Sequence, residues 1–361
     1  MHNLLSITWD MPYGLDLGFI TLRYYSLLFA AGFFAGYFVI KKMFEAEKVP
    51  DSWLDSLVTY MVIATVLGAR LGHVFFYEWD YYKEHPGKIL KVWEGGLASH
   101  GAAIAIILAL IYFSRKVTKK SPLWILDRIV IVVALAACFI RVGNYMNSEI
   151  YGTAANSAIE TVYLNPVRQS VLNAYGDRIE SLEFKSLGSE LETDSLNYPQ
   201  YEMTATFFAG QDGPSAKAFV ERYVASRINQ QSIDERNVII PIGTEASLQN
   251  ETGNAVVRIA VLGVPRYPTQ WIEAGAYLLI FLILFYLFWK TDRSKYSGFL
   301  FGSFLVLLFG TRFFVEFLKA NQVAFEQNMK LNMGQWLSIP LVLIGLYFIF
   351  TSKKKTDEQS A

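Results

Sequence analysis

Cysteine, histidine and charged side chains are all scarce in this chain. Its 361 residues include one cysteine, four histidines and 18% charged residues. The lone Cys138 excludes an intrachain disulfide, and the histidines show no metal-ligand spacing, so we expect no metal site. Nothing in the sequence indicates an organic cofactor either. Basic and acidic residues balance at 32 each, which excludes the basic surface typical of nucleic-acid-binding proteins.

Apolar residues, in contrast, make up 53% of the chain and gather into long runs. Seven runs approach the roughly 20 residues that an α-helix needs to cross a bilayer. They lie at 19–40, 56–79, 97–113, 124–147, 270–289, 298–318 and 333–351. The sequence therefore predicts an all-α polytopic membrane protein with seven transmembrane helices and one inserted polar domain.

Cationic residues predict how these spans are oriented. Lysine and arginine cluster after the first, third, fifth and seventh spans. The clusters are Lys41, Lys42 and Lys48; Arg115, Lys116, Lys119 and Lys120; Lys290, Arg293 and Lys295; and Lys353, Lys354 and Lys355. Because cytoplasmic loops are enriched in lysine and arginine, we expect an outside N-terminus and a cytoplasmic C-terminus.

Residues 153–265 interrupt the membrane pattern with a polar stretch. Runs rich in β-branched and aromatic residues predict strands there, and an amphipathic pattern predicts a helix. The expected strands are Tyr201–Phe208, Asn237–Pro241, Ala255–Leu262 and Ile179–Lys185, and the expected helix is Pro214–Asn229. The chain is thus divided into membrane spans 1–4 (residues 1–152), an extracytoplasmic α+β domain (153–265) and membrane spans 5–7 with a tail (266–361). The inserted domain lacks histidine and cysteine, so we expect it to serve recognition or stability rather than chemistry.

Polar side chains inside the predicted spans gather near their outer ends, judged at about 1.5 Å of depth per helical residue. They are Arg23, Arg70, His100, Arg141, Asn144, Gln270, Glu273, Arg312, Glu316 and Gln335. A single arginine at mid-bilayer costs roughly 2.5–3.5 kcal/mol on insertion scales, so the four arginines need partners. The sequence offers Glu149, Glu273 and Glu316.

The balance of these charges favours an anionic ligand. Four arginines against three glutamates leave one positive charge, which suits a monoanionic phosphodiester, although Glu78 would cancel it from the same site. Arginine is the side chain best suited to bidentate phosphate recognition. We therefore predict a phospholipid headgroup site that opens to the outer leaflet.

Simpler interpretations stay open for single residues. Arg141 taken alone fits an interfacial arginine that extends to headgroup phosphates. His100 fits a helix-end residue that orders a loop, and Tyr25 fits an aromatic residue of the interface belt.

Three other classes of function are also possible for a chain of this kind. An anion transporter predicts polar residues across the full membrane depth and internal repeats. An intramembrane protease predicts a deep serine or aspartate nucleophile with a paired base. A plain membrane anchor predicts spans of leucine, valine and isoleucine without four arginines. None of these patterns is found in the sequence.

Six short motifs, in the same order along the chain, resemble those of the bacterial prolipoprotein diacylglyceryl transferase family. They are Leu22–Ser26, Gly68–Gly72, Gly95–Gly101, Arg141–Gly152, Gly310–Phe317 and Met333–Gln335. The resemblance runs over nearly all of the membrane portion. The chain differs from the family at Tyr267, where a histidine is usual, and in the longer block that precedes Arg266.

This resemblance implies an activity and its partners. The reaction would transfer an sn-1,2-diacylglyceryl group from phosphatidylglycerol to the lipobox cysteine of a prolipoprotein, forming a thioether and releasing glycerol 1-phosphate. The partners would be phosphatidylglycerol, prolipoprotein signal peptides and the lipid bilayer, with no nucleic acid. The location would be the bacterial cytoplasmic (inner) membrane.

The resemblance also implies roles for individual residues. His100 would be the base for the acceptor thiol, and Arg141 and Arg312 would stabilise the charge that develops on the phosphate. The residues implied to bind phosphatidylglycerol are Arg141, Asn144, Tyr25, Arg70, Gly101 and Gly152. The supporting residues are Glu149, Glu316, Asn147, Glu273, Gln270 and Gln335. The spacing of four residues places Arg312 and Glu316 on one helix face, so we expect these two to pair.

Overall fold

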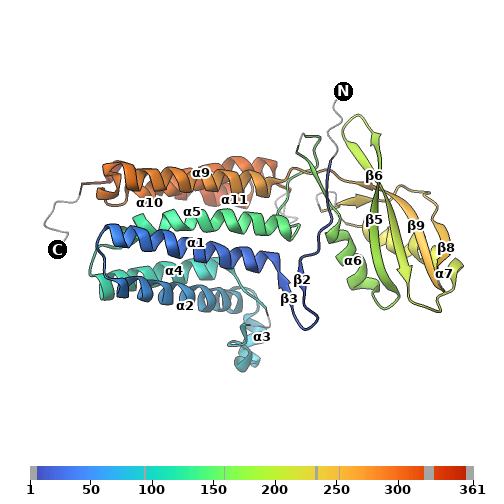
Figure 1. Ribbon diagram of the computed structural model, residues 1–361, viewed down its shortest axis with the longest axis horizontal. Coiled ribbons are helices and arrows are strands. Elements are labelled where there is room, and N and C mark those ends of the chain that lie inside the picture. The colour runs from blue at the N-terminus through green and yellow to red at the C-terminus, as the bar shows by residue number, and fades with distance from the viewer. Residues whose placement is uncertain are drawn as a thin grey trace. The chain divides into compact units, whose positions relative to one another are not determined.

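Figure 1 shows the computed structural model of the chain, which describes residues 6–92, 95–157, 159–231, 235–251, 253–320 and 329–354. The chain divides into two compact units. The sheet unit comprises Met1–Phe29, Phe139–Gly275 and Thr311–Leu337. The bundle unit comprises Ala30–Cys138, Ala276–Gly310 and Ser338–Ala361.

Seven helices in the described residues are long and apolar enough to cross a membrane, which confirms the predicted polytopic membrane protein. They are α1 (Tyr24–Ala46), α2 (Asp51–Phe76), α4 (Ser99–Phe113) with the π-helical turn Ser114–Thr118, α5 (Pro122–Met146), α9 (Thr269–Lys290), α10 (Phe299–Val315) with the 3-10 turn Glu316–Leu318, and α11 (Met333–Thr351). Each of them overlaps one predicted span.

Both ends of the first two predicted spans, 19–40 and 56–79, are wrong: the first helix continues to Ala46 and the second begins at Asp51. The first helix begins at Tyr24 and not at residue 19, because the preceding apolar residues form a hairpin of β2 (Gly14–Asp16) and β3 (Thr21–Arg23). The second helix ends at Phe76 and not at residue 79, and the short helix α3 (Trp79–Glu84) follows it. At the start of the first helix and the end of the second, the apolar run in the sequence extends beyond the transmembrane helix, because the aromatic and aliphatic residues next to the helix belong to another element.

Apolar side chains from α1, α2, α4, α5, α9 and α10 form the core of the bundle unit. Fully buried members include Leu57, Phe113, Ile131, Leu284 and Leu300. Figure 1 shows these helical segments running side by side. Glycines permit the closest approach: a Cβ built on Gly302 would lie 2.6 Å from the carbonyl oxygen of Gly345.

The sheet unit contains a five-stranded antiparallel sheet, which confirms that a sheet-containing region interrupts the membrane helices. Its order is β5 (Ile179–Glu192), β6 (Asn197–Phe207), β9 (Asn254–Gly263) and β7 (Val238–Ile239), and β8 (Ser247–Glu251) also pairs with β9. Along β6, buried and less buried residues alternate, so Tyr201, Met203, Ala205 and Phe207 face the core.

Helical segments cover one face of this sheet (Figure 1). They are α6 (Asn165–Tyr175) and the continuous run of α7 (Gly213–Phe219), a π-helical turn (Val220–Val224) and α8 (Ala225–Asn229). The predicted helix at Pro214–Asn229 is therefore present. The sequence interpretation missed α6, although its 11 residues are amphipathic and bury Val167 and Val171, and it also missed the short strand β8.

The N-terminal strand β1 (Ile7–Trp9) joins the same unit by pairing in parallel with β4 (Thr161–Tyr163). Side chains strengthen this pairing: the Ser6 hydroxyl donates to Glu160 at 2.6 Å, and Arg168 forms an ion pair with Asp10 at 2.6 Å. Residues 7–9 are thus tied to a segment 154 positions later in the chain. Sequence periodicity carries no signal for a contact of this kind.

Candidate functional site

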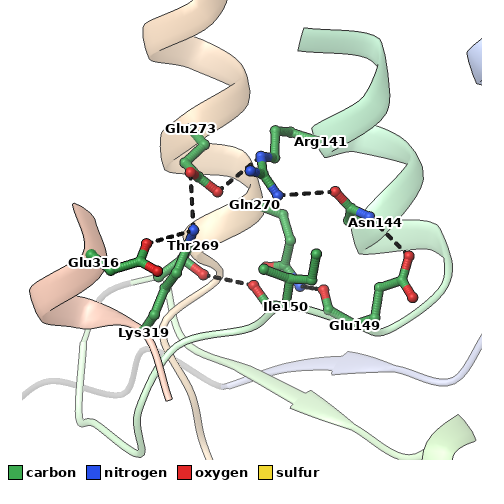
Figure 2. Close-up of polar contacts among 9 residues, drawn as sticks. All are labelled: Arg141, Asn144, Glu149, Ile150, Thr269, Gln270, Glu273, Glu316 and Lys319. Atoms are coloured by element: carbon green, nitrogen blue, oxygen red, sulfur yellow. Dashed lines mark hydrogen bonds and ion pairs between the residues drawn. The ribbon is translucent and has the colours of Figure 1, made fainter. Parts of the chain in front are cut away.

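The chain makes a strained turn directly after α5, inside the Arg141–Gly152 motif. Ser148 and Ile150 have φ angles of 52° and 59°, in the left-handed region that β-branched residues rarely adopt. Two side chains at the start of α9 hold the turn, as Figure 2 shows. The Thr269 hydroxyl donates to the Ile150 carbonyl at 3.0 Å, and the Gln270 amide donates to the Glu149 carbonyl at 2.8 Å. Gln270 therefore supports the motif through its backbone.

Arg141 is held by a carboxylate and an amide. Its Nε lies 3.0 Å from Glu273 Oε2, and its guanidinium donates to Asn144 Oδ1 at 3.2 Å. The Asn144 amide donates in turn to Glu149 at 2.8 Å, and Asn147 donates to the same Glu149 oxygen at 3.3 Å. Glu273 is fully buried, whereas the Arg141 side chain keeps 13% of its surface exposed. The structure thus brings together five of the residues that the sequence pointed to.

Glu273 is shared with a second cation, Lys319, which the sequence interpretation missed. Lys319 Nζ lies 3.1 Å from Glu273 Oε1 and 3.0 Å from Glu316 Oε2, and its side chain is only 2% exposed. Figure 2 shows the resulting row of alternating charges. The expected pairing of Glu316 with Arg312 is wrong, because Glu316 pairs with Lys319. The three-residue spacing of Glu316 and Lys319 would have been a usable signal.

Arg312 lies half-buried on α10, and its Nε is buried without a hydrogen-bond partner among the described residues. A buried donor of this kind is costly unless it is satisfied by something further, such as water or a ligand.

Gln335 fixes the start of α11. Its side-chain oxygen accepts from the Asn332 backbone N–H at 3.1 Å, and the Asn332 side chain accepts from the Gln335 backbone N–H at 2.9 Å. This reciprocal pair is a capping box. Beside it, Gly334 lies so close to Glu316 that an added Cβ would come within 2.3 Å of Oε1. The Met333–Gln335 motif therefore has a packing and capping role.

Tyr25 and Gly152 lie at two further close approaches. A Cβ on Gly143 would lie 2.8 Å from the Tyr25 ring, so this tyrosine packs directly on the helix that carries Arg141. A Cβ on Gly152 would lie 2.6 Å from the Leu318 carbonyl oxygen and 2.6 Å from the Tyr267 Cβ. Gly152 also donates its N–H to the Tyr267 carbonyl at 2.8 Å. Only glycine fits that crowded position.

Arg266, to which the sequence interpretation assigned no role, is fully buried and contacts Gly152. Its guanidinium donates to the Gly152 carbonyl at 3.2 Å, to Asn237 Oδ1 at 3.1 Å and to the Arg236 carbonyl at 2.8 Å. It also lies 4.9 Å from the centre of the Tyr151 ring. Arg266 therefore joins the Arg141–Gly152 motif to the sheet.

Tyr163, on β4, adds a link between the β1–β4 pair and α9. Burial raises the pKa of Tyr163 above its ordinary value, so the phenol keeps its proton. That proton is donated to Gln270 Oε1 at 3.2 Å. Gln270 in this way connects Tyr163 with the turn after α5.

In the bundle unit, Arg70 is buried and binds the loop that follows α2. Its guanidinium donates to the carbonyl oxygens of Lys88 at 2.6 Å, Ile89 at 2.8 Å, and Gly95 and Gly96 at 2.5 and 3.3 Å. The guanidinium also lies 4.9 Å from the centre of the Tyr82 ring. These contacts order the loop. The implied role of Arg70 in lipid binding stays a prediction.

His100 is the second residue of α4 and is exposed, with its ring 4.9 Å from Phe76 and 5.6 Å from Tyr77 between ring centres. The neighbouring Gly101 is buried where α4 meets α2: an added Cβ would lie 2.3 Å from the Gly68 carbonyl oxygen. His73, on α2, lies 3.4 Å from Glu78. Gly101 therefore has a clear packing role, and the base role of His100 stays a prediction.

In the described part of the chain, no group of three or more histidine, cysteine, aspartate or glutamate side chains is placed to hold a metal ion.

Comparison with known proteins agrees with the motifs. The sequence profile described as prolipoprotein diacylglyceryl transferase matches residues 12–351. A phosphatidylglycerol–prolipoprotein diacylglyceryl transferase of Tolumonas auensis is 33% identical over 95% of this chain and 96% of its own length. Proteins of the same name from Chloroherpeton thalassium and Porphyromonas gingivalis are each 34% identical, over 97% and 98% of this chain and 96% and 97% of their own. The chain therefore belongs to the prolipoprotein diacylglyceryl transferase family, a family of membrane transferases.

Proposed function

We propose that this protein transfers the sn-1,2-diacylglyceryl group of phosphatidylglycerol to the lipobox cysteine of prolipoproteins. The observation that carries the proposal is the Arg141 site, a partly exposed guanidinium fixed by buried Glu273 and Asn144 within a family whose members bear that activity in their names. The thiol sulfur forms a bond to the terminal glyceryl carbon, the carbon–oxygen bond to phosphate breaks, and glycerol 1-phosphate leaves. The thiol proton passes to a base.

Arg141 and Arg312 would supply the electrostatic part of this reaction. Negative charge grows on the phosphate as the carbon–oxygen bond breaks, and a fixed guanidinium in a water-poor site stabilises such charge strongly. Glu273 and Asn144 hold Arg141 in place, so little reorganisation is needed when the charge develops. The buried Nε of Arg312, which lacks a partner among the described residues, is a second donor suited to the phosphate.

Lys319 would act as a positioning residue for Arg141. Because Lys319 contacts one oxygen of Glu273 and Arg141 the other, the carboxylate charge is divided between two cations. Arg141 is therefore less neutralised than it would be by a carboxylate of its own, and keeps more of its attraction for an anionic headgroup. Glu316 balances the charge that Lys319 adds.

His100 is the proposed base for the acceptor thiol. A thiol is only slightly ionised near neutral pH, so a base raises its reactivity. The exposed imidazole between Phe76 and Tyr77 is open to an incoming peptide. Tyr25, Asn144 and Gly152 would contact the glycerol and phosphate oxygens.

The decisive experiment uses purified protein in proteoliposomes, phosphatidylglycerol labelled in its headgroup glycerol, and a lipobox peptide. We expect the peptide to gain one diacylglyceryl mass while labelled glycerol phosphate is released in equal amount. Peptide with serine in place of cysteine is the control and should gain nothing. Release of labelled glycerol phosphate without a modified peptide would instead show a lipase, and no turnover of either substrate would refute the proposal.

We further propose that the protein resides in the cytoplasmic membrane with its N-terminus and residues 153–265 outside and its C-terminus in the cytoplasm. The lysine and arginine clusters support this orientation. The exposed Ser189 on β5 gives a test: Ser189→Cys, made with Cys138→Ala, should react with a membrane-impermeant maleimide in intact spheroplasts. Reaction only after lysis would reverse the orientation.

A further inference from the structure

The hairpin of β2 and β3 exposes a run of apolar side chains at its tip. Phe19 is 88% exposed, and Leu15, Leu17 and Ile20 are exposed by 48%, 50% and 51%. Single exposed apolar residues are common on proteins, whereas a contiguous group of them marks a surface that contacts something. Hairpin turns that face water are usually rich in glycine, asparagine and aspartate instead.

This tip is a defined turn. Gly14 pairs with Arg23 and Asp16 with Thr21, and the Leu17 N–H donates to the Ile20 carbonyl at 3.0 Å. The Asp16 carboxylate accepts from the Gly18 N–H at 2.8 Å, and Gly18 adopts a φ of 84°. The apolar side chains are therefore presented by hydrogen-bonded backbone.

The hairpin runs straight into the first membrane span. Strand β3 ends at Arg23 and α1 begins at Tyr24, whose N–H donates to the Tyr13 carbonyl at 3.0 Å (Figure 1). The first turns of α1 also expose Leu27 and Phe29, as expected of a helix surrounded by lipid. The apolar surface of the hairpin thus continues a surface that already faces the bilayer, and the exposed Arg23 beside it suits lipid phosphates.

We propose that the hairpin at residues 14–23 is a membrane-surface anchor. Its tip, Leu17 to Ile20, inserts into the interface of the leaflet from which the N-terminal end of α1 emerges, and Arg23 lies at headgroup level. Arg23 is followed within two residues by Tyr25, which packs on Gly143 in the Arg141–Gly152 motif. Lipid contact by the tip therefore fixes the depth at which Tyr25 meets that motif. This surface does not depend on which reaction the protein catalyses.

The test places an environment-sensitive fluorophore on Phe19→Cys in full-length protein that also carries Cys138→Ala. In phosphatidylglycerol–phosphatidylethanolamine proteoliposomes we expect blue-shifted emission, quenching by lipids with a nitroxide near the headgroup, and weak quenching by aqueous iodide. Ile242→Cys is the matched control, because Ile242 is a fully exposed apolar residue in the segment between β7 and β8, away from the membrane helices in sequence. Its label should be quenched by iodide and not by the lipids.

The same measurement on Leu17→Cys guards against a local distortion at residue 19. Iodide quenching of both hairpin labels at the level of the Ile242 label, in protein with unchanged helix content, would overturn the proposal. Shielding of both labels from iodide and from nitroxide lipids would also overturn it, since a protein surface would then cover the tip. A label at 17 or 19 that is quenched by lipid supports the anchor even if the other variant fails to fold.

Discussion

Arg141 and Arg70 are both arginines of predicted spans, yet the protein binds them in opposite ways. Arg70 gives its donors to backbone carbonyl oxygens of one loop, whereas Arg141 is held by the side chains of Glu273 and Asn144. Carbonyl dipoles fix a guanidinium without cancelling its charge and are themselves fixed by it. Glu273, in contrast, divides its negative charge between Arg141 and Lys319, so one substitution can change how much of the Arg141 charge is neutralised. Arg70 is thus an arginine that orders a loop, whereas Arg141 is an arginine whose electrostatic effect on a ligand depends on its neighbours.

Of the substitutions considered, removal of Lys319 should change the protein most, because Lys319 shares Glu273 with Arg141. Lys319→Met leaves Glu316 and Glu273 buried with one cation fewer, and breaking a buried ion pair from one side costs about 3–5 kcal/mol. We expect a large fall in the thermal midpoint and a raised KM for phosphatidylglycerol. Lys319→Arg should restore most of both.

A double variant tells stability from positioning. Lys319→Met with Glu316→Gln removes opposite charges together, so the thermal midpoint should recover by well over half. The KM should stay high, because Lys319 no longer shares the Glu273 charge with Arg141. Full recovery of KM in the double variant would mean that Lys319 serves only to neutralise Glu316.

Arg141→Lys tests the role of Arg141 directly. Lysine keeps the charge but loses the planar fork that reaches Glu273 and Asn144 at once. Loss of one fixed donor to developing charge costs roughly 100- to 1,000-fold in rate, or about 2.7–4 kcal/mol. We expect that loss in kcat with an unchanged thermal midpoint. Activity like that of the unaltered protein would leave Arg141 as a residue that merely anchors to headgroups.

Arg70→Lys should show the opposite pattern. One ammonium cannot serve the carbonyls of Lys88, Ile89 and Gly95 together, and each lost hydrogen bond to a charged group is worth about 1.5–3 kcal/mol. Hydrogen exchange should speed up in residues 86–92, with a smaller effect on kcat than Arg141→Lys produces. A loss of kcat equal to that of Arg141→Lys, with unchanged exchange in this loop, would place Arg70 among the reacting groups.

The smallest effect concerns Asp212, a charge that is fixed by a neighbouring helix end in full solvent. The side chain and the backbone N–H of Ser215 hold the pKa of Asp212 below its ordinary value, through hydrogen bonds at 2.7 and 3.0 Å. Its stabilisation is therefore complete above the unfolded-state pKa and is lost as pH falls through the lower, folded-state pKa. At neutral pH, the amides of residues 215–219 should be better protected from hydrogen exchange in the unaltered protein than in the Asp212→Asn variant. This difference should vanish in acid. If the difference persisted below both pKa values, the Asp212 side chain would stabilise the helix start through its hydrogen-bond geometry and not through its negative charge.

Spans and motifs could be predicted from the sequence because both are local. A run of about 20 apolar residues has few alternatives to a transmembrane helix, since lipid satisfies no backbone polar group. The alternation along β6 and the amphipathic pattern at residues 214–229 likewise need only near neighbours. The prediction that polar residues lie near one end of each span likewise needs only their positions along the helix, at about 1.5 Å per residue.

Pairing was decided only by the tertiary structure. Glu316 had two cations within four residues, Arg312 and Lys319, and spacing on a helix allows either. The 3-10 turn after α10 brings Lys319 to Glu273, a residue 46 positions away, and this fixes the choice. The same holds for Arg70 and its carbonyl oxygens, for Arg266 behind Gly152, and for β1 beside β4. Sequence determined which residues lie in the membrane and which chemistry they offer, and the folded backbone determined which charges meet, because an ion pair depends on distances between segments that no local pattern encodes.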